Sequence, residues 1–177
     1  MRVLGLDLGS TTGWAVAEEQ LRIVASGTWD IAPRRGESSG CRYLHLRAHL
    51  NEALAAFDAF DLVIYEAAHH RGGHATEYAV GCVATVQAWC AQRDVEHASV
   101  HTATLKKYAT GNGRADKAAM VGAAGRIACT SRLVAPASGP GSDGYLDDNE
   151  ADAIHAARYG MERILGVADP PHPEAGA

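Results

Sequence analysis

Hydrophobic and polar positions near the start of the chain follow a pattern that predicts three short strands. Val3–Leu8 and Thr12–Ala17 have the composition of strands, and a Gly-Ser turn joins them. A third strand is predicted over Leu21–Thr28. Strands this close together in sequence form an antiparallel meander. The segment Ile31–Gly40 is rich in Gly, Pro, Ser and Arg and predicts a flexible connection.

Farther along the chain, helical periodicity alternates with short apolar runs. The run Leu62–Tyr65 is apolar throughout and ends on Glu66, which is typical of a buried parallel strand. A fifth strand is predicted over Val95–Val100. One face of a helix is formed by Tyr43, Leu46, Leu50, Leu54 and Phe57. Further helices are predicted over residues 76–93, 104–108, 115–129 and 148–165, with a loop over residues 131–145.

This order of elements defines the predicted fold class. Three meander strands followed by alternating helices and strands are typical of an α/β protein, here with a mixed five-stranded sheet and helices on both faces. A chain of 177 residues is long enough for one domain with a core and short for two. We expect residues 1–166 to form that domain and residues 167–177 to be a disordered C-terminal tail.

Composition narrows the class of protein. The chain is 47% hydrophobic and 21% charged, and no apolar run is long enough to cross a bilayer. The stretch Met1–Leu8 lacks the basic start and the cleavage site of a signal peptide. The cysteines form no CxxC pair, so reduced thiols are expected rather than a disulfide or zinc framework. These features predict a cytoplasmic protein without a membrane partner.

Acidic residues occupy the positions where such a sheet holds its ligands. Asp7 lies within the otherwise apolar segment LGLDLGS, and Glu66 follows the run LVIY. Asp148 and Asp152 share one face at the start of the last predicted helix. Ligands bind at the carboxyl ends of the strands in these sheets, where we expect the acids to meet. Carboxylate oxygens there favour two divalent cations, Mg²⁺ or Mn²⁺, which together activate a water molecule and stabilise the leaving oxygen in phosphodiester hydrolysis.

Structural explanations compete with this hypothesis to different degrees. Asp148 is also placed to cap the last helix, and Asp152 is also a first-turn acid of the kind that the helix dipole favours. Asp7 has no comparable explanation, because an unpaired carboxylate in an apolar strand is costly. Taken together, the spacing of the acids favours a metal site.

The distribution of charge matters more than its sum. A formal net charge of −5 taken alone disfavours nucleic acid as a partner. Acids gather between Asp143 and Asp152, however, and this leaves a local basic cluster elsewhere. The basic cluster consists of Lys106, Lys107, Arg114 and Lys117. Such a cluster either follows DNA phosphates or is a solvated basic face.

Four segments, taken in order, resemble a known family. MRVLGLDLGSTTGWAV, LVIYEAAHH, KKYATGNGRADKAAM and DDNEADAIHAARYG are similar to the motif regions of RuvC-type Holliday junction resolvases, across nearly the whole chain. The third segment is the most specific, through its spacing of Gly111, Gly113, Ala115 and Lys117. The resemblance implies an RNase H-like fold and a homodimeric crossover junction endodeoxyribonuclease that makes paired nicks with Mg²⁺ or Mn²⁺. It leaves open whether the source is bacterial, phage or prophage.

The resemblance also implies roles for the acids. Asp7, Glu66 and Asp152 match the metal-binding acids of the family. Three residues before its last aspartate the family usually carries an acid or a histidine, and this chain has Asn149 there, with Asp148 one step earlier. Either Asp148 or Asn149 therefore completes the metal site, and the sequence does not decide between them.

Residues expected to contact DNA follow from the same resemblance. The basic cluster lies where the family contacts the DNA backbone. His69 and His70, followed by Arg71, stand where typical relatives carry an aromatic wedge that enters the junction centre. Imidazole also stacks on a base, but the change leaves open whether forks and flaps are cut as readily as four-way junctions.

Two other classes of protein remain as alternatives. The segment GLDLGSTTGWA also resembles the phosphate-binding hairpin of actin-like sugar kinases and ATPases, which need two such domains and a second Gly-rich loop that this chain lacks. A non-catalytic RNase H-like module that binds nucleic acid is the other alternative. Asp7, Glu66 and Asp152 argue against such a module, whereas Asn149 keeps it open.

Overall fold

The computed structural model describes residues 1–67, 74–131 and 146–168. Its strands form one five-stranded sheet in the order β3-β2-β1-β4-β5. The first three strands form an antiparallel meander, and the last two run parallel to β1. The strands are β1 (Arg2–Asp7), β2 (Thr11–Glu18), β3 (Arg22–Asp30), β4 (Leu62–Glu66) and β5 (Glu96–Val100). The predicted mixed five-stranded sheet is confirmed.

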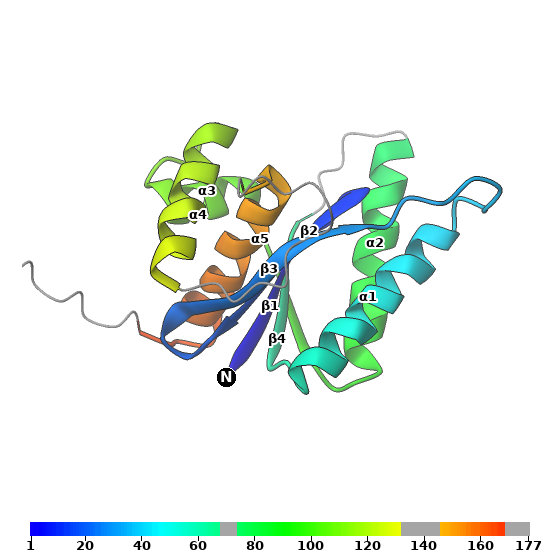
Figure 1. Cartoon of the computed structure of the whole chain (residues 1–177), viewed down its shortest axis with the longest axis horizontal. Helices are drawn as coiled ribbons and strands as arrows, with labels where there is room; N and C mark the ends of the chain where they lie inside the picture. Colours follow the sequence, from blue (N-terminus) through cyan, green and yellow to red (C-terminus); the bar gives the residue numbers. More distant parts are fainter. Residues whose placement is uncertain (68–73, 132–145, 169–177) are drawn as a thin grey trace, which may run out of the picture.

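Helices cover both faces of the sheet, as predicted. Figure 1 shows α1 and α2 on one side, with α3, α4 and α5 on the other. The α-helices are α1 (Cys41–Phe57), α2 (His74–Ala91), α3 (Thr102–Thr110), α4 (Lys117–Ser131) and α5 (Asp148–Tyr159). Within the described ranges, no helix is long and apolar enough to span a membrane.

Most observed element boundaries lie one or two residues from the predicted ones, and two differences have a clear structural cause. Leu21, expected to begin the third strand, ends a short 3₁₀ turn, η1 (Glu19–Leu21). Gln20 and Leu21 have φ values of 63° and 57°, so a left-handed turn joins β2 to β3 and the buried Leu21 is not extended. The last helix was expected to reach residue 165, but α5 ends at Tyr159 and continues as a π-helical turn, η2 (Gly160–Ile164).

Alternation along the strands separates two apolar clusters, one on each face. The cluster beneath α1 and α2 includes Leu4, Leu6, Val16, Val63 and Tyr65. The cluster beneath α5 includes Val3, Ala15, Ala17, Leu62 and Ile64. Because successive side chains of a strand point to opposite faces, Asp7 is in phase with Val3, and Glu66 with Ile64. Both acids therefore belong to the α5 face.

Helix α5 lies directly on the backbone of β1 and β2. A Cβ atom added at Gly5 would stand 2.4 Å from the carbonyl oxygen of Ala153, and one at Gly13 would stand 1.9 Å from that of Asn149. Both distances are far below van der Waals contact. Glycine at these two positions thus permits the close approach of the helix and fixes its height above the sheet.

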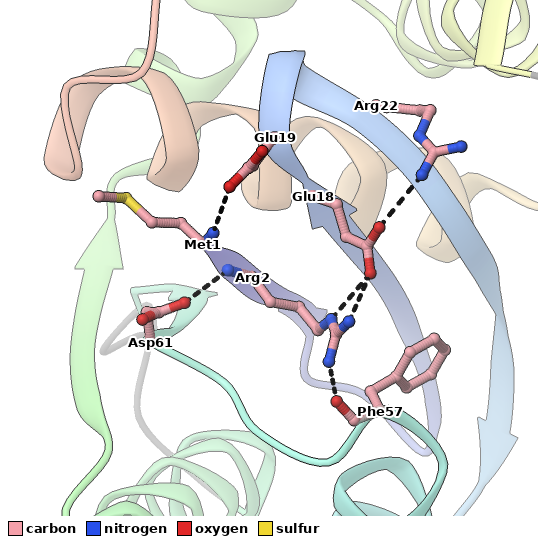
Figure 2. A network of polar contacts seen from close by, with 7 residues as sticks. All are labelled: Met1, Arg2, Glu18, Glu19, Arg22, Phe57 and Asp61. Atoms are coloured by element: carbon pink, nitrogen blue, oxygen red, sulfur yellow. Dashed lines mark hydrogen bonds and ion pairs between the residues drawn. The ribbon is translucent and has the colours of Figure 1, made fainter.

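The opposite end of the sheet is closed by a network of polar contacts (Figure 2). The guanidinium of Arg2 donates to Glu18 Oε1 from Nε at 2.9 Å and from Nη2 at 2.7 Å, and Arg22 donates to Oε2 at 3.2 Å. Arg2 also donates to the carbonyl of Phe57 at the end of α1 and, through its backbone N–H, to Asp61. The network connects β1, β2 and α1 far from the acidic edge.

Some sequence expectations fall outside the described residues. These include most of the predicted loop over residues 131–145 and nearly all of the predicted tail over residues 167–177, so the proposed domain boundary stays a prediction. Among the described cysteines, Cys41, Cys82 and Cys90 are free thiols. This agrees with the expectation of reduced cysteines.

We predict that Gly13→Ala lowers the free energy of unfolding by about 3 kcal/mol, because the new methyl group collides with the backbone of α5. Gly122→Ala is the control, since Gly122 lies on the exposed side of α4 with open space around its Cα. That change is expected to add about 0.5–1 kcal/mol through helix propensity. Urea unfolding followed by circular dichroism measures both, and a Gly13→Ala variant as stable as the wild type would contradict the packing.

Candidate active site

Three carboxylates meet at one edge of the sheet. Asp7 ends β1 and Glu66 ends β4, and these strands are parallel neighbours in a register that pairs Leu6 with Tyr65. Helix α5, packed across β1 and β2, contributes Asp152. Like-charge repulsion acts between each pair of Asp7, Glu66 and Asp152. The structure thus brings together three of the four acids that the sequence singled out.

Burial and mutual repulsion make these acids costly to ionise. Burial, followed by the charges of Asp152 and Glu66, raises the pKa of Asp7 to about 7. Burial, followed by the charge of Glu66, raises the pKa of Asp152 to about 6, although Lys106 opposes this effect. The repulsion between the carboxylates is reduced either when they bind protons or when they bind a cation.

The donor set fits a divalent cation. Asp152 Oδ1 is buried and has no hydrogen-bond donor within the described part of the chain. Carboxylate oxygens are the ligands that Mg²⁺ and Mn²⁺ prefer. As the side chains stand, no three His, Cys, Asp or Glu residues among those described surround one point closely enough to ligate an ion. Ligation of one ion by three of the described acids therefore requires these groups to move from the positions that they occupy here.

The N-terminus of α5 is capped by a residue that the sequence analysis did not consider. Asp147 is the N-cap, and its Oδ1 accepts from the backbone N–H and from Nδ2 of Asn149, both at 2.8 Å. The alternative that Asp148 caps this helix is therefore wrong. A side chain caps a helix only from the N-cap position, immediately before the first helical residue. The sequence Asp147-Asp148-Asn149 offers two adjacent aspartates and does not show which of them occupies that position.

Asp148 instead forms an ion pair with Lys117 of α4. The ammonium group of Lys117 holds the pKa of Asp148 below its usual value. Asn149, the other candidate for completing the metal site, has its amide held by Asp147. Both candidates are thus engaged with protein groups, and the choice between them stays a prediction.

The predicted basic cluster divides into two pairs. Lys106 donates from Nζ to the carbonyl of Ala115 at 2.7 Å and lies near Asp152, and Lys117 contacts Asp148. Lys107 and Arg114 have exposed side chains that point into solvent. One pair therefore contacts protein groups close to the acids and the other is available to a ligand, and DNA contact by all four residues stays a prediction. His69, His70 and Arg71 lie outside the described residues and stay predictions.

Helix α4 is tied to α5 at a second point. His155 is buried and donates from Nε2 to the carbonyl of Met120 at 3.0 Å. Burial lowers the pKa of His155, which keeps the ring neutral. Met120 lies one turn after Lys117, so this bond holds the start of α4 beside the acids.

Sequence reasoning also missed a neighbour of Glu66. Thr102, the first residue of α3, donates its hydroxyl to Glu66 Oε1. The two residues lie far apart in sequence, and threonine at the start of a helix is common. No local signal therefore marked this residue.

Comparisons with solved structures define the fold as the RNase H-like fold of the RuvC type. Thermus thermophilus RuvC matches with a TM-score of 0.69 and 19% identity, covering 96% of this chain and 99% of that one. RuvC of the same organism in complex with a Holliday junction substrate matches with a TM-score of 0.70 and 20% identity, at the same coverage. Ydc2, the yeast mitochondrial Holliday junction resolvase, has a TM-score of 0.60 and 13% identity, covering 90% of this chain and 78% of that one. No family model and no curated protein matches the sequence.

The raised pKa of Asp7 predicts a pH-dependent effect of Asp7→Asn in EDTA. The folded carboxyl has a pKa of about 7 against an ordinary value of 3.8, so the folded state binds more protons between these values and loses stability as the pH rises. At pH 8 the variant should be more stable than the wild type by about 2–4 kcal/mol. At pH 4, where folded Asp7 is already protonated, the difference should nearly vanish.

Thermal melts at the two pH values test this prediction. A gain of 2 kcal/mol corresponds to a rise of roughly 4–8 °C in Tm for a chain of this length. Asp94→Asn is the matched control, because Asp94 is exposed in the turn before β5 and lies away from the acids. Equal shifts in both variants would contradict the assignment.

Proposed function

We propose that this chain is a metal-dependent endonuclease that resolves Holliday junctions by paired phosphodiester hydrolysis. The observation that carries the proposal is the cluster of Asp7, Glu66 and Asp152, with a buried carboxylate oxygen lacking a donor, on a RuvC-type fold. Among the similar structures, one is RuvC in complex with a Holliday junction substrate and another is a Holliday junction resolvase. The sequence motifs support the same activity.

Each residue of the site has a role in this proposal. Asp7, Glu66 and Asp152 hold Mg²⁺, for which Mn²⁺ substitutes, and Asp148 or Asn149 completes the set. Two such cations would supply the activation of a water molecule and the stabilisation of the leaving oxygen of the phosphodiester. Burial of the acids keeps bulk water from screening the charges that hold the metal.

The cations of the basic cluster have two roles in this proposal, one beside the acids and one toward DNA. Lys106, beside Asp152, reduces the repulsion within the acid cluster and secures the Gly-Asn-Gly turn through Ala115. Lys107 and Arg114 face solvent and are assigned to DNA phosphates, with His69 and His70 at the junction centre and Arg71 as a further DNA contact. Paired nicks require two sites, so the active form is a homodimer on a branched DNA.

Cleavage assays distinguish this proposal from its alternatives. End-labelled immobile four-way junctions are incubated beside duplex, fork and flap DNA, with Mg²⁺, Mn²⁺ or EDTA. We expect symmetric nicks that need a metal and are confined to the four-way junction. Cutting of every branched substrate would indicate a broader nuclease, and the absence of cutting with any metal would favour the non-catalytic module.

Asp7→Asn should abolish junction cleavage while leaving DNA binding largely intact. Mutation of residues that hydrogen-bond to metal ligands typically lowers activity roughly 10–100-fold. Loss of a ligand itself is expected to lower the cleavage rate by more than this. Single-turnover cleavage measures the loss, and gel shifts in EDTA measure binding. Cleavage by Asp7→Asn at the rate of the Asp94→Asn control would remove Asp7 from the proposed site.

Arg114→Ala and Lys107→Ala should each weaken DNA binding and make it less dependent on salt. Loss of one phosphate contact reduces the slope of log K against log [salt] by about 1. Arg22→Ala is the control, since Arg22 contacts Glu18 at the opposite end of the sheet. Fluorescence anisotropy over a salt series gives the slopes, and slopes equal to that of the control would assign these side chains to a solvated face.

A further inference from the structure

The hydroxyl of Thr102 contacts the one acid of the cluster that has a long, flexible side chain. Thr102 begins α3, and its Oγ1 donates to Glu66 Oε1. A glutamate has one more rotatable bond than an aspartate, so it needs more restraint to keep one position. Asp152 shows the contrast, because its buried Oδ1 has no donor in the described structure.

The sheet itself places Thr102 beside Glu66. Glu66 pairs with Val100 in the parallel ladder of β4 and β5, and the N–H of Ala67 donates to the carbonyl of Val100 at 2.9 Å. Strand β5 ends at Val100, and His101 is the N-cap of α3, although its side chain makes no capping bond. Backbone pairing at the ends of β4 and β5 therefore holds the main chain of Glu66 close to that of Thr102.

We propose that Thr102 is a positioning residue for Glu66. The hydroxyl of Thr102 keeps the Glu66 carboxylate in the metal site against repulsion from Asp7 and Asp152. The inference rests on the proposed function, in which Glu66 is a metal ligand. Hydrogen bonds from neighbouring residues orient ligating carboxylates, and loss of one commonly costs 10–100-fold in metal affinity. The contact also joins the start of α3, which carries Lys106 and Lys107, to the acid cluster.

Metal binding without DNA tests this inference. Calorimetric titration of the full chain with MnCl₂ should give an apparent Kd about 10-fold higher for Thr102→Val than for the wild type. Thr102→Ser keeps the hydroxyl and should bind Mn²⁺ within about twofold of the wild type. Thr104→Val is the matched control, since Thr104 is exposed on the same helix. Melting curves in EDTA confirm folding, and Thr102→Ala replaces Thr102→Val if the latter does not fold.

A double-mutant cycle separates positioning from a general structural role. If Thr102 acts through Glu66, Thr102→Val should leave the Mn²⁺ affinity of a Glu66→Gln variant unchanged. Unchanged affinity in Thr102→Val, equal loss in the Val and Ser variants, or an undiminished loss in the Glu66→Gln background would each overturn the inference.

The same titrations distinguish failure of this inference from failure of the proposed function. A wild type that binds Mn²⁺ and shows the expected variant pattern, but cuts no junction, supports the role of Thr102 and contradicts the nuclease. Junction cleavage by the wild type, together with unaltered Mn²⁺ binding in Thr102→Val, supports the nuclease and contradicts the role of Thr102. A wild type that binds no Mn²⁺ overturns both.

Discussion

The close packing of α5 on the backbone of β1 and β2 is the contact on which the site depends. Gly5 and Gly13 leave no side chain between helix and sheet, so α5 lies where a Cβ atom at either position would collide with it. At that height, Asp152 reaches the edge where Asp7 and Glu66 end their strands. A helix held farther away would still cover the apolar face, but it would not assemble the acids.

Bringing the acids together lowers the stability of the folded state. Burial and repulsion raise the pKa values of Asp7 and Asp152 to about 7 and about 6, so the ionised cluster opposes folding near neutral pH. Lys106 and Lys117 offset part of this cost from α3 and α4. His155 holds α4 in place through Met120 without adding charge, because burial favours its neutral form.

The fold and the central acids could be predicted from sequence because their signals are local. Apolar periodicity defined the strands and most helices, and Asp7 and Glu66 were conspicuous within apolar runs. The cap at Asp147, the Lys117–Asp148 ion pair and the Thr102–Glu66 contact depend on exact boundaries or on tertiary contacts between distant segments. The left-handed turn at Gln20 and Leu21 escaped prediction because an apolar residue there fits a strand equally well.

The sequence separation between β1 and α5 has a consequence for how the protein is made. The two elements are far apart in sequence yet pack together, and contacts of this kind slow folding because a long loop must close first. During synthesis on the ribosome, β1 and β2 emerge well before the helix that covers them. Docking of α5 therefore completes both the cover of the sheet and the cluster of acids, and a chain in which α5 is not docked carries Asp7 and Glu66 without Asp152.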